Sequence, residues 1–158
     1  MNHDDEARLK ESVAIAAPVA RVWALVSDIC RMPEWSPQVD ATRLCDGYAS
    51  VGPGVRFDNW NSHEELRWET HGEIVRFEPE QEIAFCIDEN WVVWSFRLEP
   101  DDRGGTRLVQ RRETPDGISD YSLRLIDTYM GGQEAFTTTM RAGMRETLER
   151  IRITAERG

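Results

Sequence analysis

The chain has 158 residues, enough for one domain that buries a core and still encloses a cavity. Its 19 Lys and Arg residues are outnumbered by 29 Asp and Glu residues, and the net charge of −10 opposes binding to phosphate backbones or anionic lipid head groups. We therefore expect no nucleic-acid partner and no stable membrane insertion.

The first part of the chain predicts a strand followed by two short helices. Residues 9–16 alternate between apolar and polar side chains, as a half-buried strand does. Pro18 then opens a helix, whose apolar stripe consists of Val19, Val22, Trp23, Val26 and Ile29. A second helical turn is expected near residues 31–35. It ends before Pro37, because the residue that precedes a proline leaves the helical region.

Turn signals divide the next part of the chain into five or six further strands, about seven in all. These signals are Asp46-Gly47, Gly52-Pro53-Gly54, His63-Glu64-Glu65, Glu78-Pro79-Glu80, Asp88-Glu89-Asn90 and the segment 101–105. Their spacing predicts an antiparallel meander.

Two of these strands carry apolar and polar side chains on the same face. In residues 55–61, Val55 and Phe57 share a side with Asn59 and Asn61. The matching face of residues 68–74 carries Trp68, Thr70, Gly72 and Ile74. Buried amides cost free energy unless something hydrogen-bonds them, so this mixed face predicts a lined cavity. The alternative is that the amides only bond strand ends or loop backbone.

Pairing these two strands as a hairpin with both mixed faces inward predicts one register. Its facing pairs are Asn61 with Trp68, Asn59 with Thr70, Phe57 with Gly72 and Val55 with Ile74. In this register the Phe57 ring covers the gap that the glycine leaves.

The last two strands extend the same inner face. Trp94 and Phe96 alternate with polar residues, and the final strand turns Gln110 and Arg112 inward. An inward guanidinium has to be paired or solvated. It would anchor a ligand carboxylate or an enolate oxygen, or else form an ion pair with an acid such as Glu113, which the acidic composition favours.

A long helix is predicted from Gln133 onward. Its apolar stripe recurs every three or four residues and consists of Phe136, Met140, Met144, Leu148 and Ile151. Such a helix is long enough to lie across a whole sheet, and its first three stripe residues are expected to contact a ligand, because Met adapts to irregular shapes. Residues 118–132, which precede it, predict a shorter amphipathic segment that we interpret as a lid.

This order of elements resembles the α+β helix-grip fold, in which a curved antiparallel sheet wraps around a long C-terminal helix. The chain resembles the SRPBCC superfamily of START-like and birch-pollen-allergen-like proteins, and within it the bacterial polyketide cyclase/dehydrase branch. The matching motifs are Ala17-Pro18, Val22-Trp23, Trp35-Ser36-Pro37, Gly52-Pro53-Gly54-Val55-Arg56-Phe57 with Asn59 and Asn61, Trp68, Phe77-Glu78-Pro79, Trp94 to Pro100, Gly105 to Leu108 and Thr147-Leu148. The resemblance implies a deep, mostly apolar cavity for lipids, sterols or polyketides. It carries over no catalytic motif.

Neither a cofactor nor a metal site is expected from the remaining motifs. The three cysteines fit no metal-ligand spacing and no disulfide framework, no glycine-rich phosphate loop is present, and the three histidines form no evident cluster. The acidic start of the chain lacks the features of a secretory signal, which predicts a cytoplasmic protein. We expect residues 1–8 to form a disordered tail and residues 9–157 to form a single ligand-binding domain.

These patterns together predict binding of a small hydrophobic, partly oxygenated molecule in a cavity between the sheet and the C-terminal helix. The expected ligand-binding residues are Trp35, Phe57, Asn59, Asn61, Trp68, Thr70, Trp94, Phe96, Gln110, Arg112, Phe136, Met140 and Met144. An aromatase/cyclase that uses Arg112 or Gln110 to stabilise an enolate is the alternative. A protein-interaction module with an apolar surface around Trp60 or Trp91 is a third interpretation. Both a monomer and a homodimer remain open.

Overall fold

The computed structural model describes residues 9–45, 47–116 and 133–157. The predicted tail over residues 1–8 and the predicted lid over residues 118–132 lie outside the described residues.

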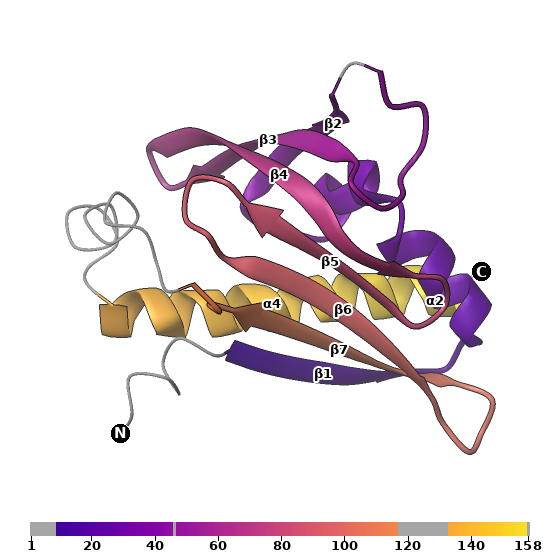
Figure 1. The fold of residues 1–158 in the computed structure, drawn as a ribbon. Coiled ribbons are helices and arrows are strands. Elements are labelled where there is room, and N and C mark those ends of the chain that lie inside the picture. Colours follow the sequence, from indigo (N-terminus) through magenta and orange to yellow (C-terminus); the bar gives the residue numbers. More distant parts are fainter. Residues whose placement is uncertain (1–8, 46, 117–132, 158) are drawn as a thin grey trace.

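Seven antiparallel strands form one curved sheet (Figure 1). They are β1 (Leu9–Ile15), β2 (Val39–Leu44), β3 (Arg56–His63), β4 (Leu66–Glu78), β5 (Glu82–Ile87), β6 (Val93–Pro100) and β7 (Thr106–Glu113). The spatial order is β1-β7-β6-β5-β4-β3-β2, so consecutive strands from β2 to β7 are neighbours and β1 pairs with β7. This is the meander that the turn signals predict.

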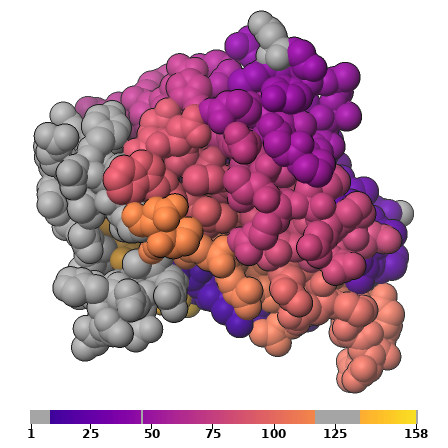
Figure 2. All heavy atoms as spheres, viewed as in Figure 1, coloured from indigo at the N-terminus to yellow at the C-terminus, as the bar shows by residue number. Residues whose placement is uncertain are grey.

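Two short helices separate β1 from β2, and one long helix follows the sheet. The short ones are α2 (Val19–Val26) and the 3-10 helix η1 (Ile29–Glu34), and the long one is α4 (Gln133–Arg157). Figure 1 shows α4 along one face of the sheet, where it contacts β1, β7 and α2. In the space-filling view from the same side, strands of the sheet lie in front of α4 (Figure 2). The molecule has the predicted helix-grip fold.

The predicted register of β3 and β4 is confirmed. The facing pairs are Asn61 with Trp68, Asn59 with Thr70 and Phe57 with Gly72. Next to them, the Ile74 backbone N–H donates a hydrogen bond to the Val55 carbonyl at 2.9 Å. The Phe57 ring covers Gly72 so closely that a Cβ built on the glycine would lie 2.4 Å from Cζ of the ring. Only glycine fits this position without a shift of the ring.

The stripe of α4 divides into two parts. Leu148 and Ile151 in its C-terminal half are buried in the main core, together with Val22 and Val26 of α2. Phe136 and Met140 in its N-terminal half are only half-buried. The C-terminal half thus holds the helix on the sheet, and the N-terminal half leaves space between the two.

The exposed apolar side chains come from separate elements. Among the described residues, the exposed large ones are Tyr48, Val75, Trp91 and Ile153. Trp60 is half-buried, and the Arg43 guanidinium lies 5.4 Å from the centre of its ring. No described helix combines the length and the apolar character that crossing a membrane requires.

Candidate ligand-binding site

A cavity of about 550 Å³ lies between the sheet and the N-terminal half of α4. Side chains from β3 to β7 form one wall, α4 forms another, and η1 with the segment that follows it closes a third side. Sites for small molecules in proteins enclose about 300–1,000 Å³ and are mostly apolar with a few polar groups. The cavity falls within this size range.

Twelve of the thirteen residues expected to bind a ligand lie in the wall of this cavity. They are Trp35, Asn59, Asn61, Trp68, Thr70, Trp94, Phe96, Gln110, Arg112, Phe136, Met140 and Met144. Phe57 is not among the lining residues: it is 1 % exposed, and its ring packs edge-to-face on Phe85 at 5.4 Å. The reason is the contact with Gly72, which draws the ring into the core beneath the cavity.

The wall also includes residues that the sequence analysis did not select. Among them are Met32, Gln38, Val39, His63, Leu66, Phe85, Ile87, Asn90, Thr139, Gly143 and Thr147. Phe85 and Ile87 lie two residues apart on β5, with the half-buried Cys86 between them. The alternation of side chains along this strand would therefore have identified both. His63 is the last residue of β3 and has the same inward phase as Asn59 and Asn61, so alternation along this strand would have identified it. Asn90 lies in a turn, where alternation gives no information about direction.

The amides of β3 point inward and have hydrogen-bond partners within the protein. Asn59 accepts a hydrogen bond from the Thr42 hydroxyl at 2.7 Å. The Asn61 Nδ2 group donates to Thr70 Oγ1 at 3.1 Å and to the Trp68 carbonyl at 3.3 Å. These bonds join β2, β3 and β4, so the amides both line the cavity and tie neighbouring strands together.

Arg112 on β7 is in a different situation. Its side chain is 4 % exposed, and its guanidinium lies 5.2 Å from the centre of the Phe136 ring, a cation–π contact. The acid proposed as its partner, Glu113, points to the opposite face and pairs with Arg76. Burial lowers the pKa of Arg112 to about 10, with no contribution from a nearby acid. The guanidinium stays charged at neutral pH and has no ion-pair partner among the described residues.

Gln110, two residues earlier on the same face, is also unsatisfied. It is 7 % exposed, and its Oε1 atom is buried without a hydrogen-bond partner in the described part of the chain. Buried polar groups in native proteins rarely lack a partner. The strand β7 therefore presents two unpaired polar side chains to the cavity.

Titratable side chains other than Arg112 lie in the wall, at exposed or half-buried positions. Glu64 and Glu146 are exposed, and Glu146 forms an ion pair with Arg150 at 2.7 Å. His63 is half-buried, and Nε2 of Gln38 lies 3.3 Å from its Nδ1 atom. The cavity therefore contains groups that can accept or donate a proton.

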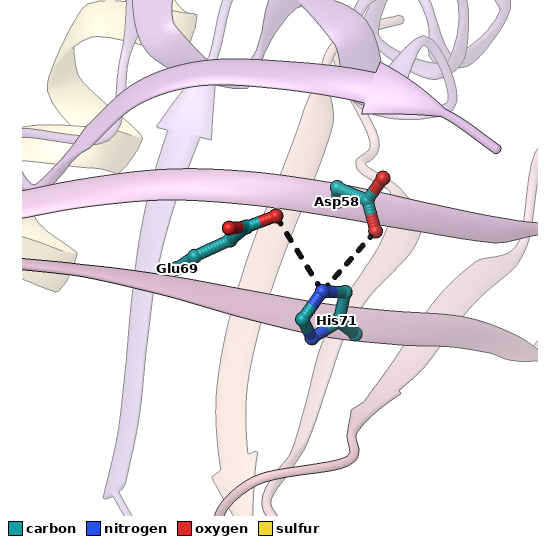
Figure 3. Close-up of side chains that lie close together, drawn as sticks. All are labelled: Asp58, Glu69 and His71. Carbon is teal, nitrogen blue, oxygen red and sulfur yellow. Dashed lines mark ion pairs between the residues drawn. The ribbon is translucent and has the colours of Figure 1, made fainter.

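A cluster of charges lies on the outer face of the sheet (Figure 3). Nε2 of His71 is 3.6 Å from Asp58 and 3.5 Å from Glu69, and the Nδ1 atom is 2.6 Å from Glu89. The hydrogen bond to Glu89, with smaller contributions from the other two acids, raises the pKa of His71. Asp58, Glu69 and His71 are the described residues whose types and spacing match metal ligands. When the imidazole is protonated, it supplies these carboxylates with a positive counter-charge, the role that a metal ion would otherwise have.

Comparison with known proteins identifies the family of this chain. Residues 6–156 match the model of the family described as polyketide cyclase / dehydrase and lipid transport. The chain belongs to this family. No curated protein matches it significantly.

Solved structures of other polyketide cyclase-like proteins share the fold. A Polyketide_cyc-like protein of Corynebacterium glutamicum is 29% identical, with a TM-score of 0.59 and coverage of 92% of this chain and 89% of that chain. The Zhui aromatase/cyclase from Streptomyces sp. R1128 is 15% identical, with a TM-score of 0.70 and coverage of 95% and 93%. The di-domain ARO/CYC StfQ of the steffimycin biosynthetic pathway is 14% identical, with a TM-score of 0.71 and coverage of 98% and 52%. At 14–15% identity, the similarity to the last two structures shows that the fold is shared, and it carries no information about the substrate.

Proposed function

We propose that this protein binds a small hydrophobic, partly oxygenated molecule in the cavity between the sheet and α4. The observation that carries the proposal is the composition of the wall. Trp35, Trp94, Phe96 and Met140 offer apolar surface, and a few polar side chains interrupt it. Apolar contact supplies most of the affinity in such sites, whereas the polar groups set the orientation of the ligand. The family, whose description includes lipid transport, supports the same conclusion.

Native mass spectrometry of the purified protein, followed by fluorescence titration with lipids and aromatic polyketides, tests this function. Trp35, Trp68 and Trp94 line the cavity, so a bound ligand should change the tryptophan emission. We expect saturable binding of one ligand per chain. A protein that binds none of these compounds would refute the proposal.

A matched pair of variants shows whether binding occurs in this cavity. Gly143 lines the cavity, and a Cβ added to it would lie 3.6 Å from Pro37, so Gly143→Phe places a ring in the cavity without a severe clash. Ile153 is exposed on the same helix, so Ile153→Phe is the control. Gly143→Phe should weaken binding by about tenfold or more, whereas Ile153→Phe should leave it unchanged.

Cyclisation of a poly-β-keto chain is the second candidate function. It is favoured by the guanidinium of Arg112, whose N–H donors suit a developing enolate oxygen, together with His63 in the same wall. Two of the similar structures are aromatase/cyclases by name. Turnover of a polyketide substrate that falls by about 10²-fold or more in Arg112→Met and His63→Gln would support catalysis. Binding without turnover would leave the carrier function alone.

A further inference from the structure

The polar side chains of the cavity wall fall into two groups on the inner face of the sheet, which lie on strands far apart in the strand order. The first group, on β3 and β4, consists of Asn59, Asn61 and Thr70. The second, on β7, consists of Gln110 and Arg112. Four strand spacings separate β3 from β7, which is on the order of 19 Å along the sheet. A ligand that fills the cavity therefore meets two distinct polar regions.

The two groups differ in whether the protein itself satisfies them. The amides of the first group have hydrogen-bond partners on neighbouring strands. In the second group, Gln110 Oε1 has no partner in the described residues, and no described acid pairs with Arg112. A buried guanidinium without a counter-charge is unfavourable, and it persists in native proteins mainly where a ligand supplies the counter-charge. The second group thus lacks a partner that the first group already has.

We propose that Gln110 and Arg112 form a carboxylate-binding subsite, and that the ligand of this cavity is a hydrophobic carboxylic acid. The guanidinium is planar and carries parallel N–H donors that match the two oxygens of a carboxylate. On the same face of β7, the Nε2 group of Gln110 can donate a further hydrogen bond to the carboxylate, and its unpaired Oε1 atom can accept one from a ligand hydroxyl. This inference rests on the proposed binding function and specifies its ligand.

The surroundings of Arg112 fit an acid with an apolar body. Its cross-strand neighbour on β6 is Trp94, and the ring of Phe136 on α4 lies over the guanidinium. On the other side β1 places Leu9 opposite it in the register. The nearby cations Arg141 and Arg145 of α4 are paired with Glu11, at 3.6 and 3.2 Å. These neighbours provide apolar contact and leave the charge of Arg112 available to a ligand.

A competition experiment with matched probes tests the subsite. The neutral dye N-phenyl-1-naphthylamine reports occupation of the cavity. Decanoate and decanol, or 2-naphthoate and 2-naphthalenemethanol, displace it at a pH of about 8, where the acids are ionised. In the wild-type protein each acid should bind about tenfold or more tightly than its alcohol, because a charge-assisted hydrogen bond is lost in the alcohol.

Variants at neighbouring positions of β7 assign this preference to Arg112. Arg112→Met should reduce the preference, measured as the ratio of the two affinities in the same variant, to less than about threefold, because the apolar contacts remain for both probes. Arg111 is the neighbouring residue on β7; it is half-buried and points to the other face of the sheet. Arg111→Met is the control, because it removes the same charge and should keep the preference for the acids. Arg112→Lys keeps the charge without the planar donor pair, so it should retain only part of the preference.

The outcomes separate this inference from the binding function. If the dye binds and each acid binds no better than its alcohol, or if Arg112→Met keeps the preference, the carboxylate subsite is wrong and cavity binding stands. If neither the dye nor any acid or alcohol binds the wild-type protein, the binding function itself fails, and the subsite with it. Should Arg112→Met not fold, loss of the preference in Arg112→Lys decides the question in the same way.

Discussion

Replacing Arg112 by Met should stabilise the ligand-free protein. The folded state keeps a charged guanidinium away from water, and no acid in the described segments pairs with it. Methionine keeps a flexible apolar stem of similar length and removes the charge. Buried charges at binding sites commonly reduce stability in this way, because their partner arrives only with the ligand.

The size of the effect follows from two opposing contributions. Burial lowers the pKa of Arg112 from its ordinary value to about 10. At 1.36 kcal/mol per pKa unit this corresponds to a penalty of about 3 kcal/mol on the charged folded state. The variant loses the cation–π contact with Phe136, which is worth about 0.5–2 kcal/mol. The net expectation is a gain of about 1–2.5 kcal/mol, or about 2–10 °C in melting temperature for a chain of this size.

The pH dependence of this difference is also specified. Because the folded-state pKa is lowered, the penalty is fully present below about pH 10 and is relieved only as the pH rises above about 10 towards the ordinary pKa of arginine. The stability difference between the wild type and Arg112→Met should therefore be constant from about pH 6 to about pH 9.

Urea denaturation followed by circular dichroism measures this prediction. The midpoint of Arg112→Met should rise with an unchanged slope, and Arg111→Met on the other face should change stability by less than about 0.5 kcal/mol. Destabilisation of Arg112→Met by about 1 kcal/mol or more would show that the guanidinium is paired in solution, and it would contradict both this reasoning and the carboxylate subsite.

Three further substitutions test the fold. Gly72→Ala should destabilise the protein by about 1–3 kcal/mol in urea titrations, because the added Cβ would meet the Phe57 ring. The companion change Phe57→Leu should reduce this effect. An unchanged stability of Gly72→Ala would show that the ring moves freely. Thr106→Val removes the 2.8 Å hydrogen bond from a buried hydroxyl to the Ala17 carbonyl and should cost about 1–3 kcal/mol by the same assay, whereas an unchanged midpoint would mean that the bond contributes nothing. His71→Gln should lower stability at about pH 5.5 by less than about 1 kcal/mol, since the site is partly exposed. The raised pKa of His71 stabilises the fold below its ordinary value of 6.5, and this contribution disappears as the pH rises through the raised value, so an equal loss at about pH 9 would contradict the assignment.

The direction of many side chains could be predicted from local alternation. Asn59 and Asn61 are inward, as their phase on β3 requires, and Gln110 and Arg112 are inward on β7 for the same reason. The register between β3 and β4 agrees with the one that the sequence favoured, and the requirement that both apolar faces point inward excluded every second register. The apolar stripe of α4 predicted the long helix, and the family resemblance implied that a cavity lies between this helix and the sheet.

Other features depended on contacts between distant parts of the chain. Alternation placed Phe57 on the same face as Asn59, yet the contact with Gly72 and Phe85 takes its ring into the core and out of the cavity wall. His63, the last residue of β3, also lies in the cavity wall, and its inward direction follows from alternation along the strand. Its contact with Gln38, which lies 25 residues earlier, and the position of the Phe57 ring have no periodic signal in the sequence.

The sequence by itself determined the strand and helix order, the inner faces of β3, β4, β6 and β7, and the family. Only the tertiary structure decided that a cavity of about 550 Å³ exists and that none of the described acids pairs with Arg112. The physical reason is that the alternation of apolar and polar side chains is a property of one segment of the chain. The space between α4 and the sheet depends instead on how Leu148 and Ile151 pack the helix against the core. The isolation of Arg112 likewise depends on Glu113 pairing with Arg76 on the far face, a contact between residues 37 positions apart.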